Sequence, residues 1–145
     1  MIEVLNRSRQ DTPDLPWVEI MNKILGPDYT LSLVFIGDKT SRKLNRAWRK
    51  KDRPTNVLAF PLEKNSGEIF LNLKKTKTEA GRFDRSEIEH IGALFIHALL
   101  HLKGYEHGSI MEKQEKKFKQ YFNFNGQTHK DRFRHRNHFG SSGGV

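Results

Sequence analysis

Three histidines in the second half of the chain have the spacing of a metal site. The stretch "IHALLHLKGYEHG", Ile96 to Gly108, places His97, His101 and His107 at positions i, i+4 and i+10. Residues four apart lie one turn above each other on one face of a helix, so His97 and His101 can both coordinate one ion. Gly104 is suited to end that helix in a left-handed turn, which would return the chain and bring His107 in as third ligand. The spacing therefore predicts metal ligation by three imidazoles.

The residue next to the first histidine indicates which chemistry such a metal would serve. Three neutral imidazoles with an open fourth position are typical of a catalytic zinc site rather than a closed structural one. The spacing is that of the zinc peptidase motif H-E-x-x-H-x-x-G-x-x-H, but Ala98 stands where the catalytic glutamate should be. A peptidase needs that carboxylate to pass a proton from water to the leaving amine. Phosphodiester cleavage depends more on stabilising the phosphoryl charge, which a metal and an arginine can supply, so Ala98 favours a phosphoryl substrate.

The distribution of charge favours a polyanionic partner. The 145 residues include 26 Lys and Arg against 17 Asp and Glu, a net charge of +9. Arg42 to Arg53 holds seven bases and one acid, a net charge of +6, and Gln127 to Val145 supplies the remaining +3. A clustered basic patch beside a hydrolytic site suggests nucleic acid, the commonest polyanion. A solvated lysine-rich face is the simpler alternative.

Length and composition are those of a single domain with one modest core. The chain has no cysteine, so any metal must be held by nitrogen and oxygen ligands. No apolar run approaches the ~20 residues that a membrane-spanning helix needs. The first residues, "MIEVLNRSRQ", lack the charged-then-apolar order of a signal peptide. We therefore expect a cytoplasmic protein.

Hydrophobic periodicity predicts the elements that must position these residues. A first helix is expected from Trp17 to Leu25, between Pro16 and Gly26. A second helix within residues 40–50 would bury one face and expose its arginines on the other, the buried face being formed by Leu44, Ala47 and Trp48. Strands are expected in residues 29–37, 54–63 and 67–73, the last two joined by the turn-like "KNSG" and paired in one sheet.

Two capping-box patterns predict the remaining helices. Ser86 and Glu89 precede the run from Ile88 to Leu102, which is apolar nearly all round and should form the central buried helix. Ser109 and Glu112 open a further helix with one apolar face. Helices and a small sheet in this order predict an α+β single domain over residues 1–126, followed by a basic, disordered tail over residues 127–145.

Two long motifs resemble a known family. "HALLHLKGYEH" is similar to H-G-x-L-H-L-x-G-Y-D-H, and "LNRAWRKKDRPTNVLAFP" is similar to L-N-x-x-[YW]-R-x-x-D-x-P-T-[DN]-V-L-S-F-P. With "GEIFLNL" between them, they resemble the YbeY family of bacterial metal-dependent endoribonucleases, which act in ribosomal RNA maturation. The resemblance runs from about Leu31 to Phe122. Ala98 replaces the usual glycine, Glu106 the aspartate and Ala59 the serine.

The resemblance implies a zincin-like α+β fold, with a small mixed sheet packed against helices and the HxxxH pair on the central buried helix. It implies one zinc ion per chain on His97, His101 and His107, and no organic cofactor. It also makes Arg49 the catalytic arginine, whose planar guanidinium is suited to bidentate contact with a phosphate. The neighbouring bases expected to bind RNA phosphates are Arg46, Lys50, Lys51 and Arg53.

The leading hypothesis is a single-strand-preferring endoribonuclease of ribosomal RNA processing and ribosome quality control. Its expected partners are ribosomal RNA and the small ribosomal subunit or its assembly factors, with no membrane. Two alternatives remain open from the residues. One is a zinc peptidase or amidohydrolase that finds its base elsewhere, with Glu106 the nearest candidate. The other is a ribosome-assembly factor whose metal is mainly structural.

Overall fold

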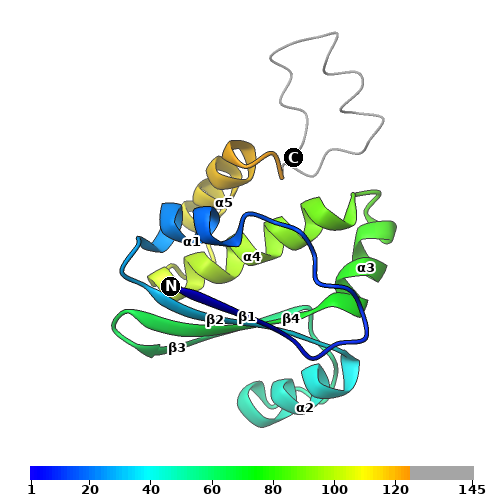
Figure 1. Ribbon diagram of the computed structural model, residues 1–145. Helices are drawn as coiled ribbons and strands as arrows, with labels where there is room; N and C mark the ends of the chain where they lie inside the picture. The colour runs from blue at the N-terminus through cyan, green and yellow to red at the C-terminus, as the bar shows by residue number, and fades with distance from the viewer. Residues whose placement is uncertain (125–145) are drawn as a thin grey trace, which may run out of the picture.

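The computed structural model describes residues 1–124, which form one mixed sheet with helices on both faces (Figure 1). In chain order the elements are β1 (Ile2–Asn6), α1 (Trp17–Leu25), β2 (Thr30–Ile36), α2 (Asp38–Arg49), β3 (Val57–Glu63), β4 (Ser66–Asn72), α3 (Leu73–Arg82), α4 (Glu87–Lys103) and α5 (Ser109–Tyr121). The α+β architecture is confirmed. The expected tail, residues 127–145, lies outside the described residues, so the boundary at residue 126 stays a prediction.

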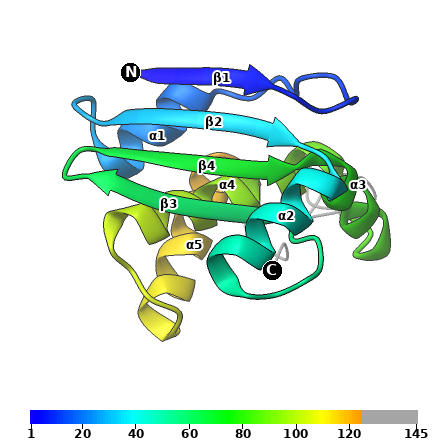
Figure 2. The ribbon, with the colours of Figure 1, turned by 90° about the horizontal axis from the view of Figure 1, so that it is seen from below.

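The sheet has the strand order β1-β2-β4-β3 (Figure 2). Strands β1, β2 and β4 run parallel, and β3 pairs antiparallel with β4. The central strands β2 and β4 carry buried apolar residues, which on β4 alternate with half-buried ones. Within residues 1–124, β3 has a paired neighbour on one side alone, so its other edge is available to line a site.

Helix α4 runs along one face of the sheet with α1, α3 and α5 around it, whereas α2 lies on the opposite face (Figure 1). Trp17 of α1 joins the two layers, because its ring lies 5.6 Å from that of Phe35 on β2 and 4.9 Å from that of Phe95 on α4. Phe95, Ile96 and Leu99 are fully buried. The expectation that this run forms the central buried helix is therefore confirmed. Within residues 1–124, no helix combines the length and apolar character that crossing a membrane requires.

The first capping box is present and the second is not. The Ser86 hydroxyl accepts a hydrogen bond from the Glu89 amide at 3.1 Å and donates one to the Glu89 carboxylate at 2.8 Å, which starts α4 as predicted. Helix α5 instead has Gly108 as its N-cap, with φ 154° and no side-chain capping bond, and Ser109 is already its first helical residue. The predicted cap at Ser109 is wrong.

Two elements were missed. Strand β1 is only five residues long, and its hydrogen bonds come from parallel pairing with β2, whose partner residues lie 29 positions further along the chain, which leaves no local signal. Helix α3 is strongly basic, and its buried face is formed by Leu73, Thr76 and Ala80 alone. The Asn72 side chain caps α3 by accepting from the Lys75 amide at 3.1 Å. That cap was the one available signal for it.

The predicted buried face of α2 is wrong. Ser41 and Asn45 are buried instead, and they hold the following loop: the Ser41 hydroxyl lies 2.7 Å from the Thr55 carbonyl, and the Asn45 amide group lies 2.8 Å from the Arg53 carbonyl. Because the helix turns its polar side inward to bond this loop, Trp48 points outward and is 70% exposed. The loop then leads directly into β3.

Candidate metal centre

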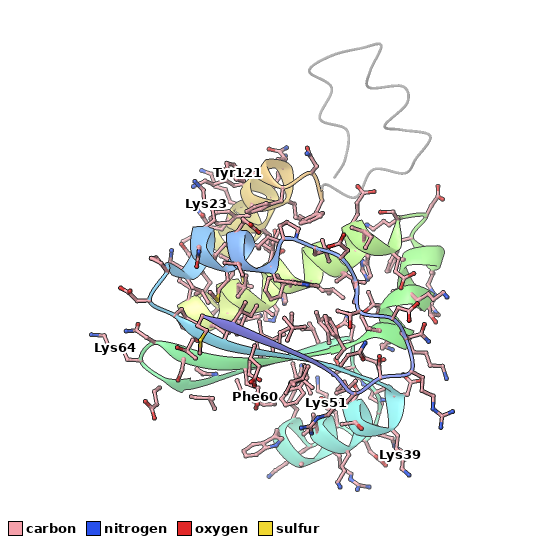
Figure 3. The ribbon with its side chains drawn as sticks, viewed as in Figure 1. Lys23, Lys39, Lys51, Phe60, Lys64 and Tyr121 are labelled. Atoms are coloured by element: carbon pink, nitrogen blue, oxygen red, sulfur yellow. The ribbon has the colours of Figure 1, made fainter. Side chains whose placement is uncertain are left out.

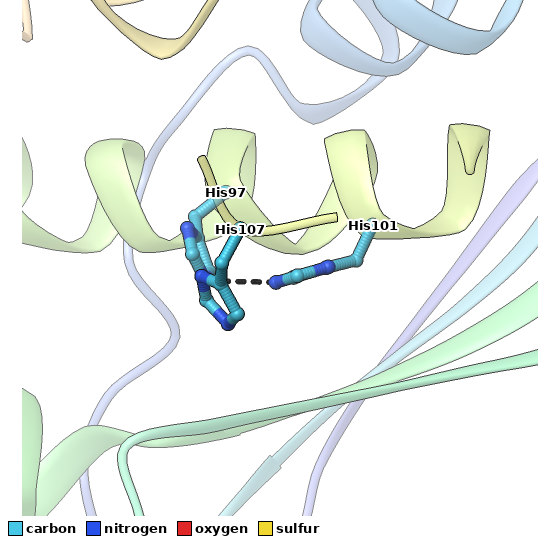
Figure 4. Close-up of side chains that lie close together, drawn as sticks. All are labelled: His97, His101 and His107. Atoms are coloured by element: carbon cyan, nitrogen blue, oxygen red, sulfur yellow. Dashed lines mark hydrogen bonds between the residues drawn. The ribbon is translucent and has the colours of Figure 1, made fainter. Parts of the chain in front are cut away.

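The three histidines predicted as ligands converge on one point (Figure 4). His97 and His101 project from successive turns of α4, and Gly104 ends that helix with φ 110° and ψ 3°, as expected for a left-handed turn. The returning chain brings the His107 ring to 4.7 Å from that of His101 and 5.4 Å from that of His97, measured between ring centres. One ring nitrogen from each histidine lies within 4.8 Å of the others. The group could hold a metal ion.

Oxygen acceptors orient both helical imidazoles from behind. His97 Nδ1 bonds the Glu115 carboxylate on α5, and His101 Nδ1 donates to the Tyr105 carbonyl at 3.1 Å. Burial opposes ionisation of Glu115, but the hydrogen bond from His97 and nearby positive charge outweigh it, so the pKa of Glu115 is lowered. Burial is the largest effect that lowers the pKa of His101, and electrostatic repulsion from His97 lowers it further. An ionised Glu115 beside a neutral His101 is the protonation pattern that metal ligation needs.

The donor atoms fit a cation better than they fit a hydrogen bond between the rings. With the ring proton of His97 and of His101 at Nδ1, where each faces an oxygen acceptor, the Nε2 atom of each ring is left to bind a cation. These two Nε2 atoms lie 3.1 Å apart, where lone pairs repel unless a positive charge lies close to both. Two nitrogens bound to tetrahedral zinc at ~2.0–2.1 Å would be about 3.3–3.4 Å apart. The residues present therefore suit zinc.

The histidines open into a cavity of about 750 Å³ between α4, α5, β3 and the end of α2. Its wall on one side is β3, from Val57 to Phe60, and Arg49 lines it from the last turn of α2. Ala98 also lines the cavity, so only a methyl group stands at the place of a peptidase's glutamate. Glu106, the alternative base, is exposed and does not line it.

Three charged cavity residues were missed by the sequence analysis: Arg85, Glu115 and Lys119. Burial lowers the pKa of Lys119, while Glu115 and Arg85 act on it in opposite directions. The missed helix α3 explains part of this omission, because Arg85 lies in the turn after it. Glu115 and Lys119 are four residues apart on α5, and this i,i+4 pair is the signal that could have found them.

A buried histidine of α4, His90, also lines the cavity but lies outside the group of three histidines. His90 Nε2 lies 3.0 Å from the Glu79 carboxylate, and Arg85 donates to its Nδ1 at 3.3 Å. Glu79 also accepts from the Asn56 side chain at 3.1 Å. These bonds tie the loop before β3 to α3 and α4, so His90 positions the cavity wall.

The bases predicted to contact RNA phosphates lie around the end of α2. Arg46, Lys50, Lys51 and Arg53 are all exposed, and Arg46 lies 3.9 Å from Asp52, which also pairs with Arg42 at 2.8 Å. None of the four lines the cavity, whereas Arg49 does. Arg49 therefore differs from its basic neighbours, because it lines the same cavity as the histidines and they do not.

Comparison with known proteins agrees with this geometry. The model of a family described as "Endoribonuclease YbeY" matches residues 10–124. Proteins of that name from Campylobacter jejuni and Helicobacter pylori are 36% and 34% identical over 115 and 121 residues, covering 74% and 81% of this chain and 85% and 86% of theirs. A Thermotoga maritima protein solved in solution superposes with a TM-score of 0.59 at 27% identity, covering 81% of this chain and 86% of its own. The chain therefore belongs to the YbeY endoribonuclease family.

Proposed function

We propose that this protein is a metal-dependent endoribonuclease that cleaves single-stranded RNA and acts in ribosomal RNA maturation and ribosome quality control. It would carry one zinc ion per chain on His97, His101 and His107, and would use Arg49 at the scissile phosphate. The cleavage of RNA follows from family membership. The ribosomal role, the partners on the small subunit and the cytoplasmic location rest on the resemblance of the motifs and are expectations.

The observation that carries the proposal is that Arg49 and the three histidines line one cavity. Arg49 comes from α2 on one face of the sheet, whereas His97 and His101 come from α4 on the other face and His107 from the segment that follows α4. A phosphate that enters between them can touch both sides. Such an arrangement suits an anion that is stabilised by two positive groups at once.

Each of these residues has a defined part in the chemistry. A bound zinc ion would supply positive charge to the phosphoryl oxygens and acidify water beside them. Arg49 presents a planar pair of N–H donors, which can follow two phosphoryl oxygens as charge builds on them. Glu115 accepts a hydrogen bond from His97 Nδ1–H and so keeps Nε2 of that ring directed into the cavity. The Tyr105 carbonyl does the same for His101.

The two alternatives are less well supported. A peptidase would need a carboxylate facing the cavity beside the metal, but Glu106 faces solvent and Glu115 is engaged with His97. A purely structural metal would be enclosed, whereas His107 is exposed and the group opens into the cavity.

The deciding experiment compares Arg49→Lys with Lys50→Ala. Arg49→Lys keeps the positive charge but loses the planar pair of N–H donors, so we expect turnover on an RNA oligomer to fall at least tenfold. RNA affinity and zinc content should stay close to those of the wild type. Lys50→Ala should weaken binding slightly and leave turnover unchanged. If the two variants behave alike, Arg49 only attracts RNA. Cleavage of a casein-like peptide in place of RNA would support the peptidase.

A further inference from the structure

Trp48 is exposed where a tryptophan is normally buried. Its side chain is 70% exposed, whereas Trp17, the other tryptophan of the chain, is 9% exposed in the core. Tryptophan is enriched at binding interfaces, where its large ring contacts a partner on one side. The inward turn of Ser41 and Asn45 explains how Trp48 comes to face outward. It does not explain why the position holds an indole.

The surroundings of Trp48 connect it to the cavity. Its ring lies 5.8 Å from the ring of Phe60, which in turn lies 5.9 Å from that of Phe70. Phe60 lines the cavity, and so does Arg49, the next residue after Trp48. Figure 3 shows Phe60 below the sheet, on the side of α2 and Lys51. Trp48 does not itself line the cavity, but it lies beside two residues that do, Phe60 and Arg49, and its ring is open to solvent over most of its surface.

The charge around this ring selects its ligand. Residues 42–53 carry a net charge of +6, and the bases on either side of Trp48 are exposed. A flat apolar ring among cations suits a molecule that alternates anionic groups with flat rings. Single-stranded nucleic acid has that chemistry. Its phosphates can bind the lysine and arginine side chains, and its unpaired nucleobases can stack on aromatic side chains. An apolar protein surface would have to bury the same cations.

We propose that Trp48 is a stacking platform for an unpaired base that adjoins the phosphate contacted by Arg49. The proposal rests on the endoribonuclease function proposed above and adds to it a residue that binds the nucleobase by stacking. It also gives a physical reason for a preference for single strands. In a duplex both faces of each base are covered by its neighbours, so a base must be unstacked before Trp48 can reach it.

The chain itself supplies the probe. It contains two tryptophans, of which Trp17 is buried and Trp48 is exposed, so a change in intrinsic emission when a ligand binds at the surface reports on Trp48 above the constant emission of Trp17. We expect single-stranded RNA, added to the zinc-loaded protein and followed immediately after mixing, to quench the emission. Inorganic polyphosphate should bind through charge without quenching, and duplex RNA should quench less. Trp48→Ala should lower the affinity for single-stranded RNA by about 5- to 150-fold, the equivalent of the ~1–3 kcal/mol typical of one stacked base.

Matched variants separate stacking from general loss of surface. Trp48→Phe keeps an aromatic face and should retain most of the affinity. Tyr121→Ala removes another exposed aromatic ring, 63% exposed and placed beside Lys23 on the far side of the molecule from Phe60 (Figure 3), and should have no effect.

Four results would overturn the proposal. If labelled RNA binds but Trp48 is not quenched, or if Trp48→Ala binds as tightly as the wild type, the ring does not stack, and the endoribonuclease function survives. Equal quenching by polyphosphate would mean that the emission reports charge alone. If the wild type neither binds nor cleaves RNA, the proposed function fails, and stacking fails with it.

Discussion

Glu115 should control metal affinity without touching the metal. Its carboxylate bonds His97 Nδ1, and its lowered pKa keeps it ionised at neutral pH. An acceptor in this position fixes the imidazole ring and makes Nε2 a stronger ligand. Removing such a partner typically weakens metal binding by about 10- to 100-fold. We therefore predict that substitutions of Glu115 lower zinc affinity while all three histidines remain.

The expected magnitude depends on the substitution. Glu115→Gln keeps an oxygen that can accept the Nδ1 proton and loses only the charge. The side chains of His97 and Glu115 are 27% and 20% exposed, so solvent screens part of that charge. We expect a loss of about tenfold, near the lower end of the range. Glu115→Ala also leaves the Nδ1 donor without its acceptor, and its loss should approach about 100-fold.

The assay is a zinc titration against a chromophoric chelator at pH 7.5, with thermal unfolding as the check on folding. Glu112→Gln is the matched control, because Glu112 is an exposed residue on the same helix and does not line the cavity. Zinc affinity of Glu115→Gln and Glu115→Ala equal to that of the wild type would refute the reasoning. Glu115 would then be a neighbour of the site without a role in organising it.

Three further predictions concern the metal, the basic patch and the cavity. His101→Ala should remove nearly all zinc by metal analysis, because two ligands rarely hold it tightly; in the wild type, the lowered pKa of His101 should let that ligand resist proton competition to below pH ~6.5. Reversal of Lys50 and Lys51 to glutamate should flatten the dependence of RNA affinity on salt and leave zinc content unchanged; an unchanged slope would place that surface away from RNA. Burial lowers the pKa of Lys119 in the folded protein. Its positive charge therefore lowers the free energy of unfolding by the full amount below the folded pKa, and this loss disappears as the pH rises from the folded to the unfolded pKa. Lys119→Met should therefore raise the melting temperature at pH 7, with a gain that shrinks towards pH ~10.4, the ordinary lysine pKa, and should weaken RNA binding; a lower melting temperature at pH 7 would contradict this.

Local rules explain the parts of the protein that were predicted correctly. The spacing of His97 and His101 on a helix, and the left-handed turn at Gly104, depend on residues within a dozen positions of one another. The strands β2, β3 and β4 and the buried helix α4 also follow from periodicity, because their faces are either strongly apolar or alternate. The α+β class and the histidine group could therefore be derived before any tertiary contact was known.

Elements with weak local signals were missed or misplaced. Strand β1 is defined by pairing with β2, and α3 hides a small buried face among charged residues. Helix α2 has a clear helical pattern, but its orientation depends on the loop from residue 50 to residue 56, whose backbone groups need Ser41 and Asn45 as partners. Burial of two polar residues in place of Trp48 satisfies those groups, and no periodicity could reveal that need.

The tertiary structure alone decided which charged residues join the histidines. Glu115 lies 18 positions after His97, and several other glutamates were closer candidates by sequence, yet the packing of α5 against α4 brings only this one to Nδ1 among the residues that the structure describes. Arg49 reaches the cavity because α2 ends beside the open edge of β3, while its basic neighbours remain outside. The sequence determined the group of three histidines, because it depends on helix geometry and one turn. Packing of distant elements determined the acceptor at His97, the arginine that shares their cavity and the exposure of Trp48.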